Sequence, residues 1–154
     1  MTRLSPGDPA PAFSLATDEG DTVSSDELAG RRYVLYFYPK DDTPGCTKQA
    51  CGLRDSWDRV LATGVDLFGV SPDSPRSHAK FRAKYALPYR LLADDGHQLA
   101  EAYGVWIEKN AMGRRYFGNE RSTFVIGPDG RIEDVLPQVK PGEHVDLLLT
   151  ALGR

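Results

Sequence analysis

Two cysteines, Cys46 and Cys51, are the residues of this sequence with the most distinctive chemistry, and they are the only cysteines in 154 residues. Cysteine reacts as its thiolate, and a helix N-terminus favours the thiolate because it offers about half a positive charge and free backbone N–H donors. The run Thr43-Pro44-Gly45 directly before Cys46 is typical of a helix start. The sequence therefore predicts that Cys46 lies in the first turn of a helix and is a candidate nucleophile.

The residues before Cys46 could shape a pocket around its sulfur. Thr43 could cap the helix and also hydrogen-bond an oxygen held beside the sulfur. Pro39 is rigid and has no backbone N–H, so we expect the loop that follows it to pack over the sulfur and restrict water. Asp41 and Asp42 disfavour a thiolate, but we expect them to be solvated and therefore screened.

Alternating strands and helices are predicted around this segment. Residues 32–38 are apolar almost throughout, which is typical of a strand buried on both faces. Apolar residues at helical spacing from Cys46 to Gly64 predict a helix of about four to five turns. Further strands are expected at 65–70, 91–92, 122–126 and 131–135, and further helices at 75–85, 97–103 and 141–152.

The N-terminal part is expected to form a hairpin-like extension, with a strand at 12–15, a turn at 18–21 and one helical turn at 25–28. The order βαβ, then α, then ββα is typical of an α/β, thioredoxin-like fold, a central mixed sheet flanked by helices. We expect residues 1–154 to form one domain, because the length leaves little room for two.

Composition excludes several classes of function. A net charge of -3 and a pI of about 5.6 argue against nucleic acid as a partner. The absence of a long apolar run and of a signal core predicts a cytoplasmic protein that does not enter membranes. The three histidines are scattered, so we expect no metal site, and we expect His144 to be a surface residue.

The whole pattern resembles a known family, the peroxiredoxins, from about Pro9 to the C-terminal helix. It is most similar to the peroxiredoxin Q or bacterioferritin comigratory protein branch. The resemblance rests on the order and spacing of Pro39, Thr43 and Cys46, on Cys51 five positions later, and on Tyr103-Gly104-Val105-Trp106 and Arg121-Ser122-Thr123-Phe124. Two positions depart from it: Gln49 stands where many relatives carry Glu, and Ala111-Met112 interrupts a loop that often carries a Tyr.

This resemblance implies a thiol peroxidase that reduces hydrogen peroxide and organic hydroperoxides without metal or organic cofactor, in antioxidant defence. It implies that Cys46 is the peroxidatic residue and that Cys51 resolves it in an intramolecular disulfide. Thr43 and Arg121 would bind and polarise the peroxide, and Pro39 would shield the site. Thioredoxin or a similar dithiol would be the reductant, and we expect a monomer.

The chemistry of peroxide cleavage gives an independent reason to look for a cation. Attack of a thiolate on one peroxide oxygen expels the other as alkoxide or hydroxide, so fixed positive donors are needed where that charge develops. Arg121 opens an expected central strand and would be held rigidly, whereas Arg114 and Arg115 fall in an expected glycine-flanked loop. The sequence therefore favours Arg121 for this role.

Helix geometry predicts how the two cysteines would meet. Five residues along an intact α-helix place the two Cα atoms about 8.7 Å apart, whereas a disulfide rarely tolerates more than about 7 Å. We therefore expect the helix from Cys46 to about Cys51 to unwind once Cys46 is oxidised.

Two other classes of function remain open on the residues alone. One is a redox-sensing protein that uses a Cys46–Cys51 disulfide as a switch without useful turnover. The other is a disulfide oxidoreductase. That activity usually uses a Cys-x-x-Cys pair, whereas four residues separate Cys46 from Cys51. Peroxide consumption with a thioredoxin system separates all three.

Overall fold

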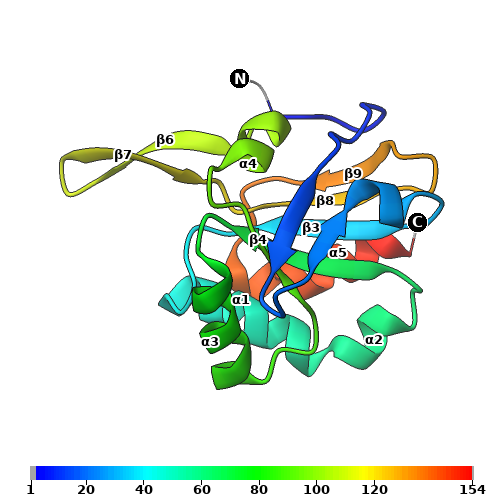
Figure 1. The fold of residues 1–154 in the computed structure, drawn as a ribbon, viewed down its shortest axis with the longest axis horizontal. Coiled ribbons are helices and arrows are strands. Elements are labelled where there is room, and N and C mark those ends of the chain that lie inside the picture. The colour runs from blue at the N-terminus through cyan, green and yellow to red at the C-terminus, as the bar shows by residue number, and fades with distance from the viewer. Residues whose placement is uncertain (1–2, 154) are drawn as a thin grey trace.

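A seven-stranded mixed sheet forms the centre of the computed structural model, which describes residues 3–153 (Figure 1). Its strands lie in the order β2-β1-β5-β4-β3-β8-β9. The neighbours β3, β4 and β5 run parallel, while β8 and β9 run antiparallel on one side. The strands are β1 Ser14–Thr17, β2 Thr22–Ser24, β3 Tyr33–Phe37, β4 Asp66–Ser71, β5 Leu91–Ala93, β8 Ser122–Ile126 and β9 Ile132–Leu136.

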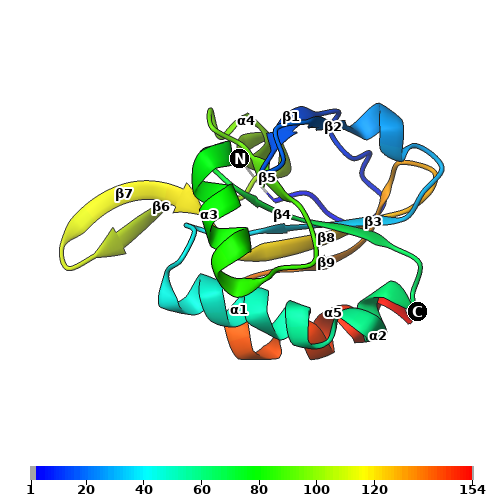
Figure 2. The same ribbon diagram turned by 60° about the horizontal axis from the view of Figure 1, so that its bottom comes forward.

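Helices cover both faces of this sheet. Figure 2 shows α1, α2 and α5 together beneath one face, with α4 on the other side of the sheet. The helices are α1 Pro44–Asp55, α2 Trp57–Leu61, α3 Pro75–Tyr85, α4 Gln98–Tyr103 and α5 His144–Leu152, with short 3-10 helices η1 Ser25–Leu28 and η2 Pro141–Glu143. Among the described residues, no helix is both long enough and apolar enough to cross a bilayer.

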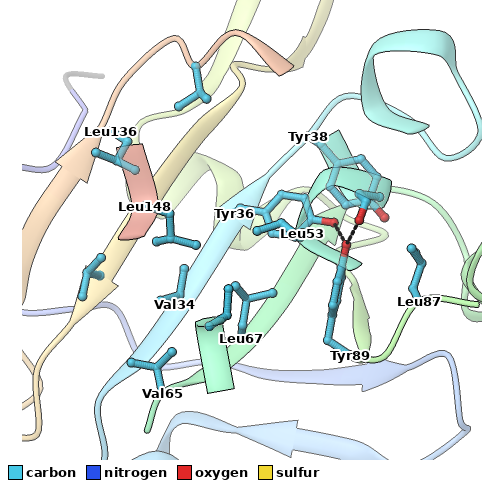
Figure 3. Packing of buried hydrophobic residues seen from close by; sticks show 14 of the residues in the cluster. Val34, Tyr36, Tyr38, Leu53, Val65, Leu67, Leu87, Tyr89, Leu136 and Leu148 are labelled. Atoms are coloured by element: carbon cyan, nitrogen blue, oxygen red, sulfur yellow. Dashed lines mark hydrogen bonds between the residues drawn. The ribbon is translucent and has the colours of Figure 1, made fainter. Parts of the chain in front are cut away.

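The β3 strand is buried along its whole length, because its side chains alternate between two apolar clusters. Val34 and Tyr36 belong to the cluster under α1 and α5, while Leu35 and Phe37 belong to the cluster on the opposite face. Figure 3 shows the first of these clusters, in which Tyr36 reaches the hydroxyl of Tyr89. The sequence prediction of a doubly buried central strand is therefore confirmed, and this strand delivers the chain to the start of α1.

Several predicted elements have different boundaries in the structure. The long helix expected from Cys46 to Gly64 is two helices, because Ser56 adopts φ -110° and ψ 17° and ends α1. The neighbouring Asp55 and Ser56 are weak helix formers that compete for backbone hydrogen bonds. The expected helix at 141–152 begins as the 3-10 helix η2, and α5 starts only at His144.

Two regions differ in connection rather than in length. The N-terminal hairpin is part of the main sheet, because β1 pairs antiparallel with β5. Residues expected as a loop around Arg114 and Arg115 instead form a second, two-stranded sheet of β6 Trp106–Ala111 and β7 Arg114–Asn119, which projects from the body in Figure 1. Met112 and Gly113 turn this hairpin with φ 53° and 79°, values typical of a tight hairpin turn.

Candidate active site

Cys46 lies where the sequence predicts, in the first turn of α1. Thr43 is the N-cap residue, with extended φ -91° and ψ 156°, and its carbonyl accepts the first helical hydrogen bond from Thr47. Pro44 occupies the first helical position, where its missing N–H costs nothing. The Cys46 side chain is buried beneath this turn at 1% exposure, so a reaction at its sulfur would take place away from bulk water.

Thr43 caps the helix through its backbone, and the expectation of a cap by its side chain is wrong. Its hydroxyl donates to the carbonyl of Lys40 at 3.0 Å and makes no cap to the helix. The bond ties the Thr43 side chain to the loop between β3 and α1, and the hydroxyl oxygen keeps a lone pair for an incoming group. Pro39 lies in the same loop, half-buried, just after β3.

Arg121 is far from Cys46 in the sequence but contacts it in the folded chain. It lies directly before β8, which pairs with β3, so the sheet brings it to the start of α1. Its Nη1 donates to Cys46 Sγ at 3.4 Å and to Gln49 Oε1 at 2.7 Å. Gly45 leaves room for this approach, because a Cβ there would lie 3.1 Å from Arg121 Nη2, a tight contact. The structure thus brings a fixed cation to the sulfur.

Gln49 continues a chain of buried polar side chains that the sequence did not reveal. Its Nε2 lies 3.0 Å from His144 Nδ1, and His144 Nε2 lies 2.8 Å from Thr123 Oγ1. The expectation that His144 lies on the surface is wrong, since the side chain is fully buried. Burial, and then the charge of Arg121, lower the pKa of His144 from 6.5 to about 3.

Lys109 on β6 is a second cation that the sequence interpretation left out. Burial and then the charge of Arg121 lower the pKa of Lys109, while the Cys46 sulfur acts in the opposite direction. These interactions place the half-buried Lys109 in the electrostatic surroundings of Cys46. It was missed because the sequence interpretation assigned no strand to residues 106–111.

Asp41 is not the solvated carboxylate that the sequence predicts. It is buried and accepts hydrogen bonds from Tyr38 Oη at 2.6 Å and Ser77 Oγ at 2.7 Å. His78 Nδ1 lies 2.7 Å from the same carboxylate. Asp42, by contrast, is exposed and pairs with Lys84, so the expectation of a solvated group holds for that residue alone.

Atoms that could ligate a metal do come together in this loop region, contrary to the expectation from spacing. Ligand atoms of Asp41, Asp73 and His78 lie within 4.8 Å of one another. Each of the three already has protein partners. Asp41 and His78 make the hydrogen bonds described above, and Asp73 accepts from Ser71 and from the Asp41 backbone N–H. The set is accounted for by hydrogen bonds within the protein.

Cys51 lies further along α1 and is half-buried, whereas Cys46 is buried, and both are free thiols. Because α1 is continuous from Pro44 to Asp55, the two cysteines differ by five residues of regular helix. Their Cα atoms are then about 8.7 Å apart, on different sides of the helix. The structure brings Arg121 to Cys46 in the helical turn that Thr43 begins, and it leaves Cys51 outside this contact.

Comparison with known proteins gives a consistent result. The model of the AhpC/TSA family matches residues 6–135. A putative peroxiredoxin bcp of Coxiella burnetii is 50% identical over 139 residues, covering 90% of this chain and 92% of that protein. Peroxiredoxin Bcp of Escherichia coli K12 is 45% identical over 152 residues, covering 99% of this chain and 97% of that protein.

Solved structures confirm the thioredoxin-like fold. A cysteine-to-serine mutant of Xylella fastidiosa PrxQ superposes with a TM-score of 0.92 at 30% identity, covering 99% of this chain and 98% of that one. The bacterioferritin comigratory protein of Xanthomonas campestris gives 0.86 at 35% identity, covering 92% and 90%. The chain therefore belongs to the AhpC/TSA family, in its peroxiredoxin Q or Bcp branch, and is a peroxidase.

Proposed function

We propose that this peroxidase reduces hydrogen peroxide and organic hydroperoxides through Cys46. The observation that carries the proposal is the buried sulfur of Cys46 with Arg121 Nη1 at 3.4 Å, in the first turn of a helix. The bacterioferritin comigratory protein of Xanthomonas campestris has alkyl peroxide reduction activity, which supports organic hydroperoxides as substrates here. Antioxidant defence is the role that this chemistry would serve.

The first step transfers two electrons from the Cys46 sulfur to the peroxide. The Cys46 thiolate attacks one peroxide oxygen, an S–O bond forms, and the O–O bond breaks. The leaving alkoxide or hydroxide takes up a proton, and the sulfur is oxidised to a sulfenic acid. Arg121 stabilises the negative charge that develops on the leaving oxygen, Thr43 offers its hydroxyl to the bound peroxide, and Pro39 keeps water from the sulfur.

Resolution would then consume the second cysteine. The Cys51 thiol attacks the oxidised Cys46, an S–S bond forms, and water leaves. Thioredoxin or a similar dithiol reduces this disulfide and is itself oxidised to a disulfide. We further propose that the protein acts as a monomer, and in the cytoplasm, because two cysteines are too few for a secreted disulfide scaffold.

The continuous α1 helix makes local unwinding a requirement of this proposal, because its regular geometry keeps the two Cα atoms beyond disulfide range. Gly45 and Gly52 flank the segment and lower the cost of opening it through their weak helix propensity. We expect hydrogen exchange of amides 46–52 to be faster in the disulfide form than in the reduced form. Equal protection in both forms would reject unwinding.

Two serine variants test the assignment of the cysteines. Cys46→Ser should abolish peroxide consumption, whereas Cys51→Ser should retain the first turnover and stop at sulfenic acid unless an external thiol resolves it. Single-turnover peroxide consumption, followed by multiple turnover with a thioredoxin system, measures both steps. Equal loss of the first turnover in the two variants would overturn the assignment, and a wild-type protein without turnover would favour a redox switch.

A further inference from the structure

The orientation of the Gln49 amide is determined by its neighbours. A guanidinium has only N–H donors, so the Gln49 atom that lies 2.7 Å from Arg121 Nη1 is the amide oxygen. The amide nitrogen, which only donates, then faces His144 Nδ1 at 3.0 Å. His144 Nδ1 is therefore an acceptor and carries no proton.

The other ring nitrogen of His144 fits the same assignment. A neutral imidazole with a bare Nδ1 carries its proton on Nε2, which donates to Thr123 Oγ1 at 2.8 Å. The groups come from three elements, since Gln49 lies on α1, Thr123 on β8 and His144 at the start of α5. One amide orientation and one tautomer satisfy every contact in this chain.

The surroundings of His144 hold the ring in this state. Its side chain is fully buried, and its ring packs against that of Tyr36 with centroids 5.4 Å apart. Burial and the positive charge of Arg121 lower its pKa to about 3, so the ring is neutral at physiological pH. A protonated ring would direct an N–H against the N–H of Gln49.

We propose that His144 is a positioning residue of the peroxidatic site, which holds the Gln49 amide with its oxygen toward Arg121 and thereby keeps Arg121 Nη1 against the Cys46 sulfur. The inference rests on the proposed function of Cys46 and Arg121. His144 acts through Gln49, and it lies outside the residues 6–135 that match the family model. Without this constraint the amide can flip and present N–H groups to the guanidinium, which displaces Arg121.

A double-variant cycle separates positioning from packing. His144→Phe keeps a ring of similar size but removes the acceptor, and should slow peroxide attack on the order of tenfold, as expected for one lost hydrogen bond. In a Gln49→Glu background both terminal atoms are oxygens, so Arg121 meets an oxygen whichever way the carboxylate turns. There His144→Phe should slow attack less than about threefold, because the coupling is gone.

Two further variants provide an alternative to His144→Phe and a control for it. Thr123→Val removes only the acceptor of His144 Nε2 and serves if His144→Phe does not fold, with the same dependence on the residue at position 49 expected. His97→Phe is the matched control, since it removes an imidazole that stacks on Trp106 at 4.1 Å. That control should leave the rate of attack unchanged.

The tautomer can be measured without any variant. The 15N chemical shifts of the wild-type imidazoles should show His144 with a bare Nδ1 and a protonated Nε2 at neutral pH. A proton on Nδ1, or equal slowing by His144→Phe in both backgrounds, overturns the proposal. If the wild-type protein failed to consume peroxide, the proposed function would fail, whereas the tautomer measurement would still accept or reject the orientation by itself.

Discussion

The two fully buried histidines of this protein face neighbours of opposite charge. Burial, and then the positive charge of Arg121 on the far side of Gln49, keep the ring of His144 neutral. His78 has its Nδ1 2.7 Å from Asp41 Oδ2 and its Nε2 2.9 Å from the carbonyl of Leu92. Because a carbonyl only accepts, His78 Nε2 donates to Leu92, while Nδ1 makes a hydrogen bond with the Asp41 carboxylate.

Both side chains are equally buried, so the charge of the neighbouring group, and not a difference in burial, distinguishes the two histidines. The cationic side, with Arg121 and His144, touches the first turns of α1 and the sulfur of Cys46. The anionic side, with Asp41 and His78, joins the β3–α1 loop to α3. We therefore expect changes on the cationic side to affect peroxide attack and changes on the anionic side to affect mainly the stability of the loop.

The largest effect should come from Arg121→Ala. Removing a preorganised donor at the developing negative charge slows comparable reactions by about 10²–10³-fold, and we expect the second-order rate of peroxide attack to fall by that amount. Stopped-flow kinetics with hydrogen peroxide measures the rate, and circular dichroism checks the fold. A folded variant that reacts at the wild-type rate would remove the cationic side from the chemistry.

A smaller effect should appear in stability at acid pH. His144 has the ordinary pKa of 6.5 in the unfolded chain and a pKa of about 3 in the folded protein. Between these two pH values the unfolded state therefore binds a proton at His144 and the folded state does not. The free energy of unfolding should therefore fall between pH 6.5 and pH 3, by at most about 1.4 kcal/mol per pH unit from this group.

Urea unfolding at a series of pH values measures this dependence. The loss of stability toward acid should be shallower in His144→Phe than in the wild type, because the variant lacks the proton-binding group. A matched series on His97→Phe serves as the control, because the His97 ring is half-buried and stacks on Trp106 of β6. The stability of this variant should show the pH dependence of the wild type. Parallel curves for wild type and His144→Phe would contradict a neutral buried His144.

The sequence predicts much of the cationic side, because local signals specify it. The Thr43-Pro44-Gly45 run defines the start of α1, and the buried positions 46, 49, 50 and 53 follow one face of that helix. His144 could have been found by the same reasoning, since positions 144, 148, 151 and 152 form the buried stripe of α5. Its polarity made a surface position the simpler interpretation.

The anionic side could not be predicted from local sequence. Asp41 looks like any loop carboxylate, and its burial depends on α3, whose Ser77 and His78 come from more than thirty positions further along the chain. The β6–β7 hairpin was missed for a different reason. Its residues 110–117 are exposed on both faces, so neither the alternation of a half-buried strand nor an apolar run marks it.

Of the changes to the two sides, Asp41→Asn should have the smallest effect on peroxide attack. It replaces the carboxylate beside His78 with an amide, like the Gln49 amide beside His144. The new amide oxygen can accept from Tyr38, and the amide nitrogen can donate to His78 Nδ1, as Gln49 does to His144. The second amide hydrogen can go to Ser77 Oγ, whose hydroxyl then accepts instead of donating. His78 Nε2 would still donate to the carbonyl of Leu92.

Because this replacement keeps a partner for each buried group, it avoids the penalty of an unpaired charge, and we expect a folded protein with a rate of attack within about threefold of the wild type. Stopped-flow kinetics gives the rate, and 15N shifts should show a bare Nδ1 on His78 in the variant. A slowing as large as that of Arg121→Ala would mean that the Asp41 charge acts on Cys46 directly. The division between a chemical cationic side and a structural anionic side would then be wrong.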